Sequence, residues 1–265
     1  MRILLTNDDG IYAPGLRALR PELMKLGEVT VVAPATEQSA VGHSVTLTTP
    51  LIVQEVLDEN KCLLGWAVEG RPADCVKLAL RELLLAAPDL IVSGLNAGSN
   101  AGINVLYSGT VAAAIEGAFF KCTSIACSLD YTRARPLDFV RAASLARQVI
   151  EQIVARRPVQ GTLFNVNIPD LDKGPVRGIR TVRQNVVPYF EGAYDRRVDP
   201  RGRVYFWSSP EFSCPEPHPD TDVSALAEGY VSVTPLQFDL THRPLVQEMA
   251  DWQWQLKNED AARET

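Results

Sequence analysis

Two adjacent carboxylates near the start of the chain are the residues best suited to chemistry. Asp8 and Asp9 follow the apolar run at residues 2–5 and precede a turn that contains Gly10 and Pro14. The run predicts a buried strand, so both carboxylates leave its carboxyl end, the edge at which open α/β sheets bind ligands. Neighbouring acids repel each other unless a proton or a cation lies between them. On this segment alone, an Asp-Asp-Gly turn with Asx hydrogen bonds is an equally good interpretation.

A polar loop at 34–44 follows the second predicted strand, at 29–33, and therefore lies beside the Asp8 turn if the two strands are parallel neighbours. Ser39 in this loop offers a hydroxyl oxygen to a cation, and His43 offers a general acid or a phosphate donor. The competing interpretations are a capping serine and a structural histidine. A later loop at 95–104 is rich in Gly, Ala, Ser and Asn, so its backbone can approach a ligand closely.

The run Ser108-Gly109-Thr110 precedes an Ala-rich helix predicted at 111–121. Free N–H groups at a helix start, together with two hydroxyls, form a cradle for phosphate. This is not a Walker loop, because no Gly-Lys-Ser/Thr follows. The alternative is an ordinary N-cap by Ser108 or Thr110.

Strands and helices alternate through residues 1–169, which predicts an α/β fold with a doubly wound, mostly parallel sheet. Beyond it, residues 170–220 are rich in Arg, Pro and aromatics, with a hairpin expected around Asp199-Pro200-Arg201-Gly202. The pattern places strands at 2–6, 29–33, 51–57, 62–68, 89–94, 123–129, 163–168 and 230–234, and helices at 14–26, 73–85, 111–121, 137–155 and 222–228. Pro21 is expected to kink or break the first helix.

The C-terminal tail carries an apolar stripe. Leu245, Met249, Trp252 and Leu256 recur at spacings of 4, 3 and 4, so they share one helix face. The alternatives are packing on the chain's own core and packing on a partner. A protruding arm followed by a terminal helix favours exchange with a second copy, which predicts a homodimer at least.

Composition excludes several classes of protein. The chain has 265 residues and a net charge of -6, which argues against binding to a nucleic-acid polymer. No apolar run approaches the roughly 20 residues of a membrane span, and no signal peptide precedes Asp8. The cysteine count is odd, at 5, without a C-x-x-C pair. We therefore expect a cytoplasmic protein with reduced thiols and no zinc site.

The chain resembles the SurE (survival protein) family of metal-dependent 5'/3'-nucleotidases. Seven collinear strings spread over most of the chain carry the resemblance, where any one of them would be weak. They are TNDDGIYAPG at 6–15, VVAPATEQSAVGHSVT at 31–46, PADCV at 72–76, PDLIVSGLNAGSNAG at 88–102, YSGTVAAAIEG at 107–117, NVNIP at 165–169 and TDVSALAEGYVSVTPL at 221–236.

The resemblance implies a Rossmann-like catalytic core at 1–169 plus 221–243, with 170–220 and 244–265 as an extension for oligomerisation. It implies a homodimer or homotetramer formed by C-terminal exchange. The implied reaction is hydrolysis of nucleoside 5'- and 3'-monophosphates. Some members of the family also cleave short polyphosphate. The implied cofactor is one Mg²⁺ or Mn²⁺ per subunit, since all the matching ligands supply oxygen. The metal ligands are Asp8, Asp9, Ser39 and Asn96, the catalytic residues Asp8 and Asp9, and the phosphate or substrate residues Asn96, Ser108, Gly109, Thr110 and His43.

Two departures and two rival classes stay open. Arg71 stands where the family often has Thr, and Asn104 stands where some members have an acid. A haloacid-dehalogenase-type phosphatase would need Asp-x-Asp after the first strand. A response-regulator receiver would need a phosphoacceptor Asp at the end of a later strand, whereas Asp89 starts one. Either water or an Asp carboxylate could be the nucleophile.

Overall fold

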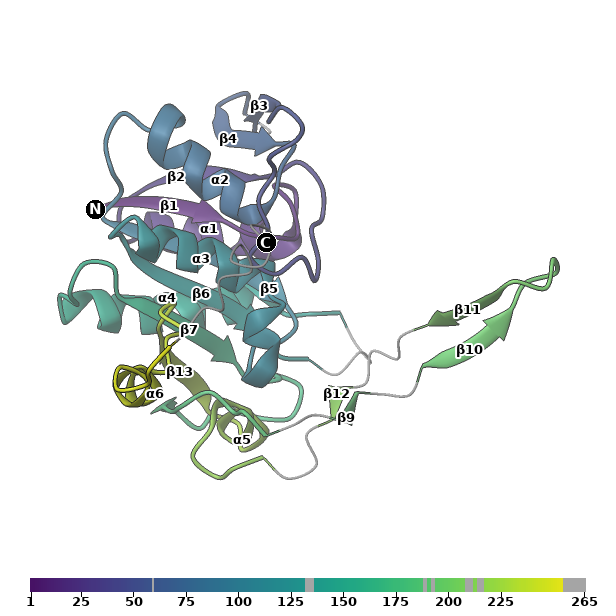
Figure 1. Ribbon diagram of the computed structural model, residues 1–265. Helices are drawn as coiled ribbons and strands as arrows, with labels where there is room; N and C mark the ends of the chain where they lie inside the picture. Colours follow the sequence, from purple (N-terminus) through teal and green to yellow (C-terminus); the bar gives the residue numbers. More distant parts are fainter. Residues whose placement is uncertain are drawn as a thin grey trace, which may run out of the picture.

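The computed structural model describes residues 1–58, 60–131, 136–187, 190–191, 194–207, 212–213 and 217–254. Its centre is one large β-sheet with helices on both faces (Figure 1). The strands of this sheet are β1 (Arg2–Thr6), β2 (Glu28–Pro34), β3 (Val53–Leu57), β4 (Leu63–Val68), β5 (Leu90–Ala97), β6 (Thr123–Leu129), β7 (Leu163–Ile168), β8 (Ile179–Thr181) and β13 (Val231–Leu236).

The strand order within the described residues is β3-β4-β2-β1-β5-β6-β7-β13-β8. The six strands from β4 to β7 pair in parallel, while β3 at one end and β13 near the other pair antiparallel. After β1 the chain moves outward through β2 and β4, then returns to β5 on the other side of β1. The gap between the carboxyl ends of β1 and β5 is therefore the switch point at which such sheets bind ligands.

Helices cover the two faces as the strand–helix alternation predicts. α1 (Pro14–Met24) packs with α4 (Phe139–Ala155) on one face, and α2 (Pro72–Leu78) packs with α3 (Gly109–Phe119) on the other. The predicted stripe of α1 is confirmed, because Leu16, Leu19 and Leu23 are fully buried. The α/β, doubly wound fold predicted from the sequence is thus confirmed.

Local differences from the prediction have simple causes. Pro21 does not end α1, since the helix runs on to Met24 with Pro21 on its exposed side. The helix expected at 73–85 becomes a π-helical turn, η1 (Ala79–Leu83), after Leu78. β5 continues to Ala97, so Asn96 lies at a strand end where a loop was expected. A 3-10 turn, η2 (Gly102–Leu106), precedes α3.

The predicted arm is present. The hairpin of β10 (Asp195–Val198) and β11 (Val204–Trp207) projects away from the sheet (Figure 1). A short pair, β9 (Phe190–Glu191) with β12 (Phe212–Ser213), lies nearer the body. The helix α5 (Asp222–Ala227) then leads into β13.

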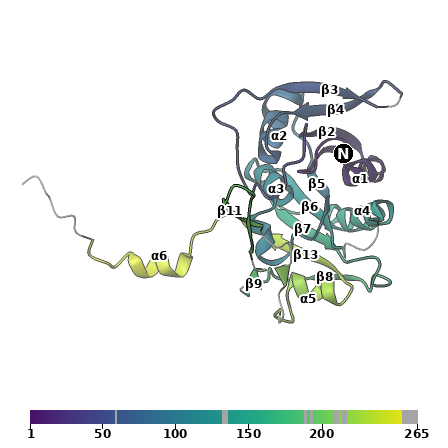
Figure 2. The same cartoon turned by 90° about the vertical axis from the view of Figure 1, so that its right-hand side faces the viewer.

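The tail differs from the predicted long helix. α6 (Arg243–Met249) has no buried residue and extends away from the body (Figure 2). Trp252 lies beyond its end, and Leu256 and Cys214 fall outside the described residues. In the described part of the chain, no helix has the length and apolar character that crossing a membrane requires.

Candidate functional site

A closed turn presents the two carboxylates at the carboxyl end of β1. The Asn7 side chain bridges it, since its Nδ2 donates to the Gly10 carbonyl at 2.9 Å and its Oδ1 accepts from the Gly10 N–H at 3.2 Å. Gly10 has a φ of +100°, which favours glycine. The turn does use Asx hydrogen bonds, but Asn7 makes them in place of Asp8 or Asp9, so the two aspartates are not needed to close it.

Asp8 is buried against the start of α3. Thr110 Oγ1 donates to Asp8 Oδ1 at 2.5 Å. A Cβ built on Gly109 would lie 3.0 Å from Asp8 Oδ2, so the absence of a side chain there lets the helix start meet the carboxylate. Burial raises the pKa of Asp8, and the hydroxyl of Thr110 opposes that rise. The structure thus joins the predicted metal site to the predicted phosphate cradle.

Asp9 is half-buried beside the end of β5. Burial, reinforced by the charge of Asp8, raises the pKa of Asp9 to about 6, while a backbone hydrogen bond at Ala97 opposes the rise. Within the described residues, neither Asp8 nor Asp9 has an ion pair with Lys, Arg or His. Two acids therefore meet at the switch point, and no cationic side chain in the described part of the chain pairs with them.

Asn96 and Ser39 come from the neighbouring segments. Asn96 Nδ2 donates to the Gly98 carbonyl at 2.7 Å, which leaves its Oδ1 as an acceptor at the end of β5. Ser39 is exposed, and its Oγ donates to Glu37 Oε1 at 2.5 Å. The charge of Glu37 contributes to the raised pKa of both Asp8 and Asp9. The loop after β2 therefore adds the charge of Glu37 to the site, while Ser39 as a metal ligand stays a prediction.

Ser108 is the N-cap of α3. Its Oγ accepts from the Val111 N–H at 3.1 Å, and the residue is buried. The first N–H groups of a helix have no intrahelical acceptor, so the backbone at Gly109 and Thr110 presents donors beside Asp8. Since the Thr110 hydroxyl donates to Asp8, its role in phosphate binding stays a prediction alongside its observed role in orienting Asp8.

His43, in the loop after β2, contacts α3 further along its length. Its Nε2 is 2.8 Å from Oε2 of Glu116, a buried residue two turns into α3. Gly42 N donates to the carbonyl of Tyr107, just before α3, at 2.9 Å, so the loop that carries Ser39 is held both at the start of α3 and at Glu116. The predicted role of His43 as an acid or phosphate ligand is untested, and its observed contact fastens this loop.

Sequence reasoning missed three residues of the site. Asn7 was part of the signature run but received no role, although an Asn before Asp-Asp-Gly is a typical turn residue. Glu37 gave no local signal, because it approaches Asp8 and Asp9 only through the fold. Glu116 was one polar residue in an apolar helix, which is the pattern that could have drawn attention to it.

The donor set is of the hard, oxygen-rich kind. No three side chains among the described His, Cys, Asp and Glu residues gather in a metal-binding arrangement. The predicted ligand set is not a cluster of that kind, since it combines two carboxylates with the neutral oxygens of Ser39 and Asn96. Such a set suits Mg²⁺ or Mn²⁺.

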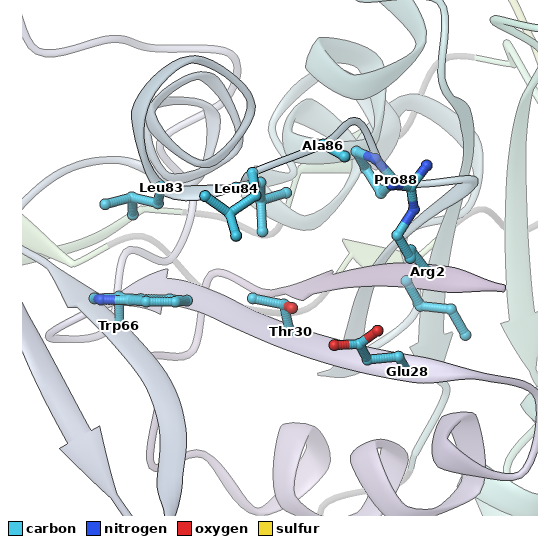
Figure 3. Close-up of a pocket in the computed structure, with 10 residues that line it drawn as sticks. Arg2, Glu28, Thr30, Trp66, Leu83, Leu84, Ala86 and Pro88 are labelled. Carbon is cyan, nitrogen blue, oxygen red and sulfur yellow. The ribbon is translucent and has the colours of Figure 1, made fainter.

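A separate cavity of about 330 Å³ opens at the opposite edge of the sheet. Figure 3 shows Trp66 and Thr30 on the sheet side, with Leu83 at the end of η1 and the next residue, Leu84, facing them. Arg2 borders it and donates its N–H to Asp89 at 2.7 Å. The cavity lies at the amino ends of β1 and β2, away from the carboxyl edge that carries Asp8, so it is not the site described above.

Together, the fold and the site define a Rossmann-like α/β protein with paired acids and a helix N-terminus at its switch point. The family model described as survival protein SurE matches residues 3–191. The chain belongs to this family, as the resemblance predicted.

Named relatives and a solved structure support membership of this family. The chain is similar to a 5'-nucleotidase SurE of Rhodopirellula baltica, with 52% identity over 95% of this chain and 98% of that protein. It is 46% identical to a 5'-nucleotidase SurE of Heliobacterium modesticaldum, over 95% of this chain and 92% of the relative. The crystal structure of the SurE protein from Aquifex aeolicus superposes with a TM-score of 0.81 at 37% identity, covering 94% of this chain and 98% of that one.

Proposed function

We propose that this chain is a divalent-metal-dependent phosphomonoesterase that hydrolyses nucleoside 5'-monophosphates, and also 3'-monophosphates and short polyphosphate. The observation that carries the proposal is the contact of Thr110 with Asp8, which places paired acids against a helix N-terminus at the switch point. Family membership and relatives named 5'-nucleotidase SurE at 44–52% identity make this chain a hydrolase of the 5'-nucleotidase type.

Asp8, Asp9, Ser39 and Asn96 would hold one Mg²⁺ or Mn²⁺. Support comes from the burial of two acids without a described cationic partner, because ionised carboxylates in that setting need a cation. When bound, the ion would supply Lewis-acid polarisation of a phosphate oxygen and charge neutralisation. The donor chemistry fits such an ion, and Asn7 fixes the turn that carries its two charged ligands.

Other groups of the chain would orient the phosphate and take up a proton. The N–H groups at Gly109 and Thr110 would orient the phosphate, and the α3 dipole favours its charge. Asp8 or Asp9 would take a proton from an attacking water. The hydroxyl of Thr110 would keep the Asp8 carboxylate oriented within the same site.

A substrate panel tests the proposed activity. Phosphate release would be measured from 5'- and 3'-nucleoside monophosphates, para-nitrophenyl phosphate and short polyphosphate, each with Mg²⁺, Mn²⁺ or EDTA. The proposal expects metal-dependent release from the 5'-monophosphates. Absence of release from every monophosphate in the presence of either metal would contradict it. A receiver module, the rival class, would give no turnover.

Metal binding should stabilise the fold in a pH-dependent way. Because the folded pKa of Asp9 lies above its ordinary value of 3.8, near 6, the metal-free protein loses stability as pH rises through that window. The raised pKa of Asp8 acts in the same direction. We expect Mn²⁺ at a hundredfold excess over Kd to raise Tm by about 5–10 °C at pH 7, and by much less at pH 4.5, where protons compete.

Differential scanning fluorimetry with and without EDTA makes this measurement. Asp9→Asn should lose most of the metal-induced shift at pH 7. Asp89→Asn, a matched change at the opposite edge, should keep it. An equal shift at both pH values, or an equal shift in both variants, would place the ion elsewhere.

We also propose a homodimer or homotetramer in which the C-terminal segment is exchanged. Support comes from the apolar groups that the single chain leaves uncovered. In α6 and beyond, Leu245, Val246 and Trp254 are 40%, 54% and 70% exposed, and in the hairpin Phe206 and Trp207 are 57% and 60% exposed. Isolated exposed apolar residues are ordinary, but two projecting segments that each carry several are typical of an interface.

Deletion of residues 244–265 should produce monomer or aggregate, because the surface that the tail covers on its partner is lost. Size exclusion coupled to light scattering measures the mass. The paired change Trp252→Ser with Trp254→Ser should weaken assembly, while Val159→Ser, at an 81% exposed position on the body, should not. A full-length monomer, or a truncated chain with the full-length oligomeric state, would refute the proposal.

A further inference from the structure

A second cavity adjoins the site at the carboxyl edge of the sheet. Its volume is about 580 Å³, within the usual range for small-molecule sites of roughly 300–1,000 Å³. The loop after β2 forms one wall and the turn between β4 and α2 forms the other. Its polar lining includes Thr36, Gln38, Thr46 and Thr48 on the first wall and Glu69 and Arg71 on the second.

Both walls touch the candidate site directly. Gln38 N donates to the Asp8 carbonyl at 2.7 Å. On the other wall, a Cβ built on Gly109 would lie 3.2 Å from Cγ of Pro72, the residue after Arg71. A nucleotide with its phosphate at Gly109 would therefore extend its nucleoside into this cavity.

The backbone that presents the second wall is held in place. Glu69 N donates to the Ile52 carbonyl at 2.8 Å, and Arg71 N donates to Asp74 Oδ2 at 2.8 Å. The same buried Asp74 carboxylate accepts from Thr46 N at 3.0 Å, so one side chain links the two walls. A cavity with fixed walls loses little conformational entropy when a ligand enters.

The charged groups in the cavity complement one base better than another. Arg71 Nη1 donates to Gln38 Oε1, and within the described residues neither Arg71 nor Glu69 has an ion pair. Guanine offers the acceptors O6 and N7, which suit an arginine, and N–H donors at N1 and N2, which suit a carboxylate. Adenine presents a donor where guanine has O6. Glu69 also disfavours a second phosphate in this space.

We infer that this cavity is the nucleoside subsite and that Arg71, together with Glu69, selects guanine over adenine nucleotides. The inference rests on the proposed function and deepens it.

Steady-state kcat/KM values for GMP, IMP, AMP and para-nitrophenyl phosphate test the inference. The unaltered protein should favour GMP over AMP by about tenfold. Arg71→Thr should bring that ratio close to one, mainly through KM for GMP and IMP. Glu69→Gln should reduce kcat/KM for GMP more than kcat/KM for IMP, because IMP lacks the N2 amino group. Arg156→Thr, an exposed matched change at the end of α4, should keep the original ratio.

The outcomes separate this inference from the proposed function. Hydrolysis of all four substrates without preference for GMP over AMP would overturn the subsite assignment alone. So would an Arg71→Thr variant that keeps the preference for GMP over AMP. Failure to hydrolyse any of them with Mg²⁺ or Mn²⁺ would overturn both.

Discussion

Asp8→Asn should lower kcat for a nucleoside monophosphate by at least about a hundredfold. The change removes one negative charge from the proposed metal site, where charge stabilisation in the transition state amounts to several kcal/mol. Asparagine has nearly the same shape and keeps an oxygen for the Thr110 hydroxyl, which lies 2.5 Å from Asp8 Oδ1. We therefore expect the fold to survive while turnover is lost.

Stability separates the loss of chemistry from a loss of structure. Because burial raises the pKa of Asp8, an uncharged Asn should leave the metal-free Tm at pH 7 unchanged or higher. Asp89→Asn is the matched control at the far edge of the sheet. Phosphatase activity of Asp8→Asn within a factor of about three of the unaltered protein would remove Asp8 from the site.

Gly109→Ala should also cost about a hundredfold in kcat/KM, the scale expected when a site is displaced by about 1 Å. The new Cβ would lie 2.8 Å from Asp8 Cβ and 3.0 Å from Asp8 Oδ2, closer than side chains normally approach. The carboxylate or the helix start must then move. Gly109→Val should be worse, because its methyl groups would also occupy the space proposed for phosphate.

If the new Cβ of Gly109→Ala displaces the site, phosphate binding should weaken while the fold is kept. Gly109 lies in the first turn of α3 without a positive φ, so alanine is compatible with its backbone and the fold should form. Inhibition by inorganic phosphate or vanadate should weaken together with turnover. Val159→Ser, at an exposed position on the body, serves as the control and should retain activity. Unchanged vanadate inhibition in Gly109→Ala would place the phosphate elsewhere.

The sequence was sufficient to predict the parts of the fold that depend on local periodicity. The buried run before Asp8 and the leucine spacing of α1 each determine an element, and their alternation determines a parallel sheet. The position of Asp8, Asp9 and the loop of Ser39 at one edge then follows from topology. Ser108 as an N-cap is equally local, because its side chain needs only the N–H three residues ahead.

Contacts between distant segments were beyond sequence reasoning. The carboxylate of Glu37 matters because the loop after β2 folds back toward Asp8, and Glu116 matters because His43 reaches it from 73 residues away. The tail illustrates another limit. Its apolar spacing predicted a long helix, but α6 ends at Met249, and beyond it the tilted rings of Trp252 and Trp254 contact each other with their centroids 5.3 Å apart. A stripe that lacks a surface to pack against gives little support to a helix.

Phosphate release from GMP by protein treated with EDTA, before and after Mn²⁺ or Mg²⁺ is restored, tests the central claim most directly. The account predicts no release in EDTA and recovery with either ion in the unaltered protein, with little or no recovery in Asp8→Asn. Full activity in EDTA, or equal recovery in Asp8→Asn, would contradict a metal-dependent phosphomonoesterase built on the Asp8–Asp9 turn.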